Sequence, residues 1–170
     1  MQRLQQLTQW LHSQLPDKNF TLAPASADAS FRRYFRVTFA DSVCNTLIVM
    51  DAPPQHEDCR PFLHVAKLFE DAGTHVPHAY AQDLQQGFLL LSDLGNTTYL
   101  QALNAGTARE LYGAATDALI KIQLASRDNE LPPYDEALLL REMRLFPEWY
   151  IAKHLNVTLT DKQHAKLEEV

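Results

Sequence analysis

One short stretch, Phe88-Leu89-Leu90-Leu91-Ser92-Asp93-Leu94-Gly95, separates two parts of the chain that have different sequence patterns. Its first four residues are apolar without alternation, which is typical of a strand that is buried on both faces. Gly95 favours a turn after that strand. From Asn96 onward, no segment has the two-residue period of a strand. We therefore expect a sheet up to about residue 93 and helices alone in residues 94–170.

Before this stretch, strand patterns alternate with two helical ones. Strands are expected at residues 20–23, 31–39, 46–50, 76–82 and 88–92, which are rich in aromatic and β-branched side chains. Apolar residues at helical spacing predict a first helix over residues 2–15 and a second over residues 61–72. This order predicts an α+β fold, in which a five-stranded antiparallel sheet carries one flanking helix.

The second part of the chain contains four helical patterns. The sequence Thr107-Ala108-Arg109-Glu110 has the form of a capping box and opens a long helix. Helices over residues 135–146 and 148–155 are expected to be divided by Pro147. A second capping box, Thr160-Asp161-Lys162-Gln163, opens the last helix, which reaches Val170 without a C-terminal cap. We therefore expect that the natural chain continues beyond residue 170.

The composition excludes several classes of protein. Hydrophobic residues make up 46% of the 170 residues, and the longest apolar runs are too short to cross a bilayer. Lys and Arg number 15 against 21 Asp and Glu, and the resulting charge of −6 argues against nucleic-acid and membrane partners. The N-terminus lacks a secretory signal. We expect a cytoplasmic protein with Cys44 and Cys59 as reduced thiols.

The loop between the first two strands has the residue types that suit a polyphosphate. Small residues over 25–30 let backbone N–H groups approach phosphate oxygens, and Ser30 adds a hydroxyl. Arginine follows at two positions of one strand face, Arg32 and Arg36, about 13 Å apart. They cannot hold the same phosphate, and Arg32 lies nearer to the loop. The alternative at this point is a solvated strand face with ordinary ion pairs.

The segment after the buried strand could bind the edge of a flat base through its free backbone groups, or it could be an ordinary turn. Histidines cluster at residues 56, 64, 75 and 78, but their spacing is not that of a zinc site, so no metal ligands are expected. The motifs of esterases, zincins, Rossmann proteins and P-loop proteins are missing from the sequence.

In the order of its elements, the chain resembles the N-terminal lobe of the aminoglycoside phosphotransferase family, the small-molecule relatives of protein kinases. Three strings are similar to the bacterial cell-wall sugar kinases of that family: Val49-Met50-Asp51-Ala52-Pro53-Pro54, Asp58-Cys59-Arg60-Pro61-Phe62 and Leu138-Leu139-Leu140-Arg141-Glu142-Met143-Arg144-Leu145-Phe146-Pro147-Glu148-Trp149-Tyr150. Those enzymes phosphorylate the anomeric hydroxyl of N-acetylmuramate and N-acetylglucosamine. The resemblance implies a kinase-like lobe over residues 1–93, with a hinge and the start of a helical lobe over residues 94–170.

The resemblance also implies site residues. A nucleotide would contact the small-residue loop over residues 25–30 (the covering loop) with the residues that follow it, the third strand, and the hinge. The residues at these three places are Ser30, Phe31, Arg32, Arg33, Ile48, Met50, Ser92, Asp93 and Leu94. Met50 stands where kinases carry the lysine that binds the α- and β-phosphates and pairs with a helix glutamate. Arg32 or Arg33 would then supply the charge. The sugar would contact Arg141, Glu142, Arg144 and Trp149.

The resemblance further implies ATP and Mg²⁺, but the His-Gly-Asp catalytic motif and the later metal-binding Asp are missing from these residues. Both are expected after residue 170, so residues 1–170 alone should transfer no phosphate. The expected activity of the whole protein is that of an ATP-dependent amino-sugar kinase. An aminoglycoside or choline-type kinase of the same fold and a noncatalytic nucleotide-binding module are the alternatives.

Overall fold

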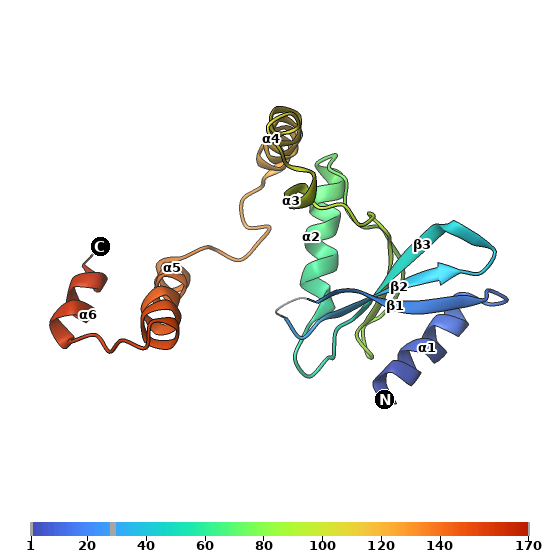
Figure 1. The fold of residues 1–170 in the computed structure, drawn as a ribbon, viewed down its shortest axis with the longest axis horizontal. Coiled ribbons are helices and arrows are strands. Elements are labelled where there is room, and N and C mark those ends of the chain that lie inside the picture. The colour runs from blue at the N-terminus through green and yellow to red at the C-terminus, as the bar shows by residue number, and fades with distance from the viewer. Residues whose placement is uncertain (1, 28–29, 170) are drawn as a thin grey trace. The chain divides into compact units, whose positions relative to one another are not determined.

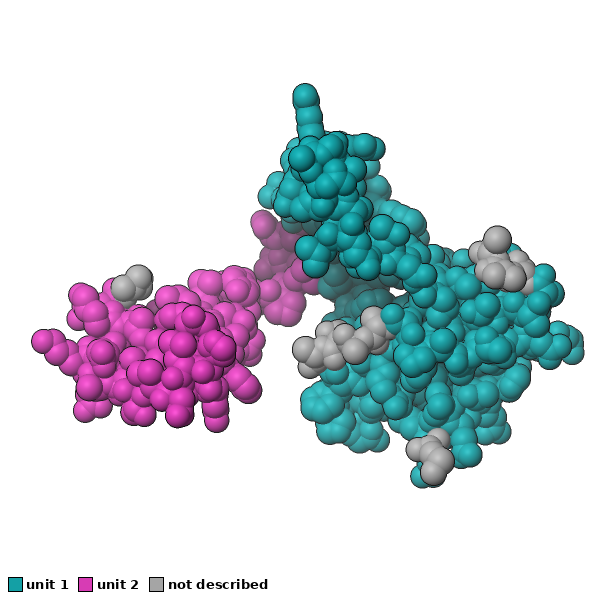
Figure 2. All heavy atoms as spheres, in the orientation of Figure 1, with its two compact units in different colours: residues 1–126 teal, residues 127–170 magenta. Residues whose placement is uncertain are grey.

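The computed structural model describes residues 2–27 and 30–169. These residues form two compact units, residues 1–126 and 127–170, which Figure 2 distinguishes by colour. Within the described residues, no helix has the length and apolar character needed to span a membrane. Each unit is described by itself below. The division into lobes at residue 93 stays a prediction.

The first unit is built on the expected five-stranded antiparallel sheet (Figure 1). Its strand order is β1-β2-β3-β5-β4, and neighbouring strands are antiparallel throughout. The strands are β1 (Phe20–Ala27), β2 (Arg33–Phe39), β3 (Ser42–Asp51), β4 (Ala79–Asp83) and β5 (Phe88–Ser92). Phe88 to Leu91, the first four residues of β5, are all buried, as the continuous apolar run predicts.

One face of the sheet packs on helix α1 (Gln2–Gln14). Leu7 and Leu11 of α1 are fully buried, and the Trp10 ring lies 5.6 Å from the ring of Phe88. Leu4 belongs to the same predicted apolar stripe but is exposed. This core also takes Val37, Val49 and Leu90 from the sheet. The expected sheet therefore carries a second helix on the face opposite its predicted flanking helix.

The predicted flanking helix is α2 (Cys59–Asp71), and it covers the other face. Because side chains alternate along a strand, this face takes Met50 of β3 and both Leu89 and Leu91 of β5. Asp58 caps α2 by accepting a hydrogen bond from the backbone N–H of Arg60 at 2.9 Å. The two faces of the sheet are thus distinct, and each has its own helix.

The boundaries of the first four predicted strands are wrong at one end or at both. The third strand, predicted over residues 46–50, runs over Ser42–Asp51. The errors in the first two strands have local reasons. The second strand begins at Arg33 instead of residue 31, since the backbone N–H of Arg32 bonds to the Ser30 hydroxyl at 3.2 Å and not to the ladder. The first strand continues to Ala27, past a bulge at Pro24/Ser26. The loop is therefore shorter than predicted, and its residues 28 and 29 lie outside the described residues.

The fourth strand begins at Ala79, three residues later than predicted. Pro77 has no N–H to donate to a ladder, which accounts for the late start. The next residue, His78, already meets the neighbouring strand, because its backbone N–H donates to the Ser92 hydroxyl and its carbonyl accepts from the Ser92 N–H, both at 2.9 Å.

After the sheet come α3 (Tyr99–Ala102) and α4 (Ala108–Ala125), of which the sequence pattern predicts only the second. The capping box expected at Thr107 is wrong. The Thr107 hydroxyl donates to the carbonyl of Ala102 at 2.7 Å and accepts from the N–H of Asn104 at 3.0 Å, so it closes the preceding turn instead. A capping box does open α3, between Thr98 and Gln101.

The second unit contains α5 (Glu136–Leu145), a π-helical segment η1 (Phe146–His154) and α6 (Asp161–Glu168). Pro147 does not divide two helices as predicted. It lies in the first turn of η1, where a missing N–H is tolerated, so the helical path continues from α5 into η1. The capping box at Thr160 and Gln163 is confirmed at the start of α6.

Candidate functional site

The third strand carries no cation at the position where the resemblance expects one. Met50 is fully buried on the α2 face of the sheet, against Cys59 and Leu89. Ile48, two residues earlier, packs against the same cluster. Burial raises the pKa of the Cys59 thiol, which keeps it neutral beside Met50. Any charge at this part of the sheet must come from another element.

Arg33 does not supply that charge on the α2 face. It is the register partner of Asp51, whose fully buried carboxylate it binds through Nε at 3.1 Å and through a second, shorter contact. Arg3 of α1 binds the other oxygen of the same carboxylate at 2.7 Å. Asp51 therefore links strand and helix on the α1 face, opposite to Met50. Of the two arginines that the sequence offers as a source of this charge, Arg33 lies on the α1 face of the sheet, away from Met50.

Arg32 lies on the α2 side. Its Nε donates to the Glu57 carboxylate at 3.0 Å, and its guanidinium carbon is 6.0 Å from the centre of the Phe62 ring. The side chains of Arg32 and Glu57 are 27% and 15% exposed, so water screens the pair only in part. Burial by itself lowers the pKa of Arg32, but the hydrogen bond and charge of Glu57 outweigh it and raise that pKa.

The end of the loop before β2 is held at a second point beside this ion pair. The Phe31 ring stacks on the ring of His56, with centres 4.4 Å apart and planes inclined by 17°. Phe31 is otherwise exposed, and the Ser30 hydroxyl accepts from the N–H of Arg32. Phe31 and Arg32 are consecutive, as are His56 and Glu57. Phe31 and Arg32, which follow the loop, are thus fixed to the segment that leads into α2.

The segment after β5 is anchored by the side chain of Asp93. Its carboxylate accepts from Arg36 Nε at 2.5 Å, from the Thr46 hydroxyl at 2.7 Å and from the N–H of Gly95 at 2.8 Å. The hydrogen bond from Arg36 lowers the pKa of Asp93 to about 2, so the carboxylate is charged at neutral pH. This arrangement ties β2 and β3 to the hinge.

The backbone N–H of the next residue, Leu94, is available for a hydrogen bond. Within the described residues, no hydrogen bond involves the backbone N–H of Leu94, and its side chain is half exposed. Ser92, by contrast, is paired with His78 on both its backbone N–H and its hydroxyl. Of the three hinge residues predicted from the sequence, Asp93 and Leu94 thus have backbone N–H groups that can bond the edge of a base, since no hydrogen bond of either N–H is found within the described residues.

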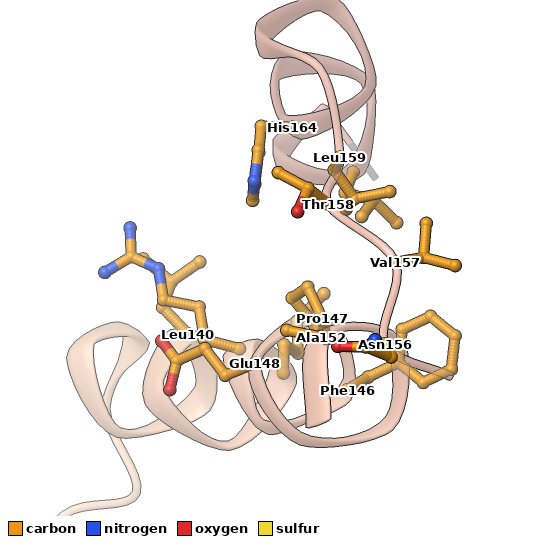
Figure 3. Close-up of a pocket in the computed structure, with 13 residues that line it drawn as sticks. Leu140, Phe146, Pro147, Glu148, Ala152, Asn156, Val157, Thr158, Leu159 and His164 are labelled. Carbon is orange, nitrogen blue, oxygen red and sulfur yellow. The ribbon is translucent and has the colours of Figure 1, made fainter. Parts of the chain in front are cut away.

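The four residues predicted to bind the acceptor belong to the second unit. A hollow of about 790 Å³ lies there, and Arg144 contributes to its lining. Glu148 and His164, which also line it, are labelled in Figure 3. Arg141 and Glu142 form an exposed ion pair with each other at 3.2 Å. Neither of these two, nor the exposed Trp149, belongs to the lining of this hollow. Their role in binding an acceptor stays a prediction.

Sequence reasoning missed four residues that the structure adds to the site. Arg36 and Thr46 hold the hinge carboxylate, while His56 and Glu57 hold the residues that follow the covering loop. Within residues 2–27 and 30–169, no three His, Cys, Asp or Glu side chains form a group that could hold a metal ion.

A comparison with known families assigns this arrangement. Residues 21–170 match the pattern of the phosphotransferase enzyme family. The chain belongs to this family. Its phosphotransferase fold therefore agrees with the kinase-like sheet, helix α2 and hinge described above.

Among curated proteins, the chain is similar to three that are named N-acetylmuramate/N-acetylglucosamine kinase. It is 51% identical to the protein from Pseudomonas aeruginosa and 49% identical to that from Pseudomonas putida, in each case over 99% of the chain and 52% of the relative. The protein from Neisseria meningitidis is 44% identical over 96% of the chain and 49% of the relative. The chain thus spans about half the length of the curated relatives it matches.

Proposed function

We propose that the whole protein is an ATP-dependent kinase that phosphorylates an amino sugar, N-acetylmuramate or N-acetylglucosamine, for the recycling of the cell wall. The observation that carries the proposal is the sequence identity of 44–51% between this chain and three relatives with that name, over almost the entire chain. The kinase-like sheet and hinge support the nucleotide part of the proposal.

The first unit has residues that fit ATP. Leu94 offers an unpaired backbone N–H at the hinge, where it would bond the adenine edge. Ile48 and Leu91, which belong to one apolar cluster of the sheet, would contact the flat face of the base. Ser30 and Arg32 would face the phosphates from the covering loop and the residues that follow it. ATP supplies the phosphoryl group, while these residues bind and orient the nucleotide.

Mg²⁺ would neutralise charge on the phosphates. Among the described residues, no three His, Cys, Asp or Glu side chains form a group that could hold it, and we assign no ligand in this chain to the metal. The family resemblance implies a catalytic base and metal ligands outside these residues, and the chain spans 52% of the relative from Pseudomonas aeruginosa.

The hinge assignment predicts the effect of a proline at residue 94. Leu94→Pro removes the N–H that would bond adenine, and no hydrogen bond of the fold uses that N–H. We expect ATP affinity of the whole protein, measured by calorimetry, to fall by about tenfold, since one hydrogen bond contributes about 0.5–1.5 kcal/mol. Leu94→Ala keeps the N–H and should bind ATP nearly as well as the wild type. Unchanged affinity in a folded Leu94→Pro protein contradicts the assignment.

A panel of acceptors tests the proposed activity. The whole protein, with ATP and Mg²⁺, should release ADP with N-acetylmuramate and N-acetylglucosamine at least tenfold faster than with kanamycin or choline, because a site shaped for sugar hydroxyls leaves buried groups unpaired with other acceptors. A preference for the amines would favour the aminoglycoside or choline kinase alternative. ATP binding without turnover of any acceptor would favour the noncatalytic module.

A further inference from the structure

Kinases need a charged pair beside the nucleotide phosphates, and the third strand of this chain does not provide one. The ion pair of Arg32 and Glu57 lies on the α2 side of the same sheet. We propose that it replaces the lysine–glutamate pair of kinases: Arg32 binds the nucleotide phosphates, and Glu57 is the positioning residue that holds Arg32. This inference rests on the proposed binding of ATP. It goes further by assigning the phosphate-binding cation and a partner for it.

The other arginines of the segment are committed elsewhere. Residues 30–39 contain three arginines. Arg33 binds the buried carboxylate of Asp51 on the α1 face, and Arg36 binds Asp93 at the hinge. Arg32 is the remaining one, on the α2 side and directly after the covering loop. Because Met50 is buried and uncharged, Arg32 is the cation of this segment that can meet phosphates beneath the loop.

Glu57 is held in place by the backbone around it. The N–H of Glu57 donates to the carbonyl of Pro53 at 3.0 Å, in the turn that follows β3. The carboxylate is 15% exposed, and α2 begins two residues later. Glu57 therefore joins the strand that carries Met50 to the helix that packs on it. In kinases the glutamate partner comes from the corresponding helix, whereas here it precedes that helix.

The stack of Phe31 on His56 fixes the chain after the covering loop beside the ion pair. With two consecutive contacts, the backbone at Phe31 and Arg32 has little freedom to move away from the start of α2. An arginine has five N–H donors in a rigid fork, and the bond from Nε to Glu57 uses one of them. Held in this way, the guanidinium is preorganised for phosphate oxygens.

The test compares ATP with adenosine, which has the base but no phosphate. In the whole protein, Arg32→Gln should weaken ATP binding by about ten- to a hundredfold, as expected for charged hydrogen bonds, and leave adenosine affinity within about twofold. Glu57→Gln should weaken ATP by about three- to tenfold with adenosine again unchanged. Arg32→Lys should fall between the wild type and Arg32→Gln, because an ammonium keeps the charge but loses the fork.

Arg60→Gln is the matched control, since Arg60 is an exposed arginine near the start of α2 that pairs with Asp58. It should change neither affinity. An ATP-to-adenosine affinity ratio equal to that of the wild type in Arg32→Gln overturns the inference while leaving the proposed kinase function intact. A wild-type protein that binds neither ligand overturns both. Retained adenosine binding shows that each variant is folded, and if Arg32→Gln is not, Arg32→Lys and Glu57→Gln decide through the same ratio.

Discussion

Gly87→Ala should destabilise the first unit by about 3 kcal/mol or more, because two independent costs combine at this residue. Gly87 has a φ of +72°, a left-handed conformation that strains any side chain with a Cβ. The Cβ of an alanine would also lie 1.8 Å from the carbonyl oxygen of Ala52. That carbonyl belongs to a fully buried residue whose own N–H donates to Gly87 at 2.8 Å, so neither backbone can retreat easily.

The measurement is urea unfolding of the whole protein, followed through the fluorescence of Trp10 in a background in which every other tryptophan, Trp149 included, is replaced by phenylalanine. Trp10 packs against Phe88, the neighbour of Gly87, so its emission reports on this part of the core. Gly73→Ala is the matched control, since Gly73 has a φ of +75° but no atom within 4 Å of the added Cβ. It should cost about 1–2 kcal/mol, the strain alone. Equal costs at the two glycines would contradict the close approach.

The fold could be predicted from the sequence wherever periodicity was strong. The apolar run of β5, the alternation of β2 and the helical spacing of α2 predict the elements that the structure contains. The errors lie at element ends, where one side chain competes with the ladder or the helix. Ser30 removes Arg32 from the second strand, and Thr107 closes a turn instead of capping a helix. Such competition depends on rotamers and neighbours that residue patterns do not contain.

The types of residue in the candidate site could be predicted from the sequence, but the contacts between these residues could not. Alternation along a strand places Arg32 and Arg33 on opposite faces, but both stay candidate sources of charge until the structure shows which face each one meets. The register pairs Arg33 with Asp51 on the α1 face. Glu57 and His56 could not be found from the sequence, because they meet the residues after the covering loop across 25 residues of chain. A contact of this kind is set by how α2 packs on the sheet.

The same separation of faces gives Asp51 a structural role. Both of its carboxylate oxygens are used by different arginines, Oδ1 by Arg3 and Oδ2 by Arg33, and its side chain is fully buried. Asp51→Asn removes the charge and places an amide NH₂ against a guanidinium, whichever way the amide is turned. We expect the free energy of unfolding to fall by about 3 kcal/mol, as for other buried ion pairs that lose one partner.

The loss of stability should also differ between elements, because the Asp51 carboxylate joins α1 to β3. Arg3 additionally donates to the carbonyl of Gln86 and lies 4.7 Å from the centre of the Phe88 ring, so loss of the carboxylate loosens the first turn of α1 against the sheet. Hydrogen exchange should therefore speed up at the backbone amides of α1 before those of β5. Asp58→Asn, at an exposed pair with Arg60 and with an equally good helix cap, should leave unfolding and exchange nearly unchanged. An Asp51→Asn protein as stable as the Asp58→Asn control would show that the two arginines hold their positions without the buried charge.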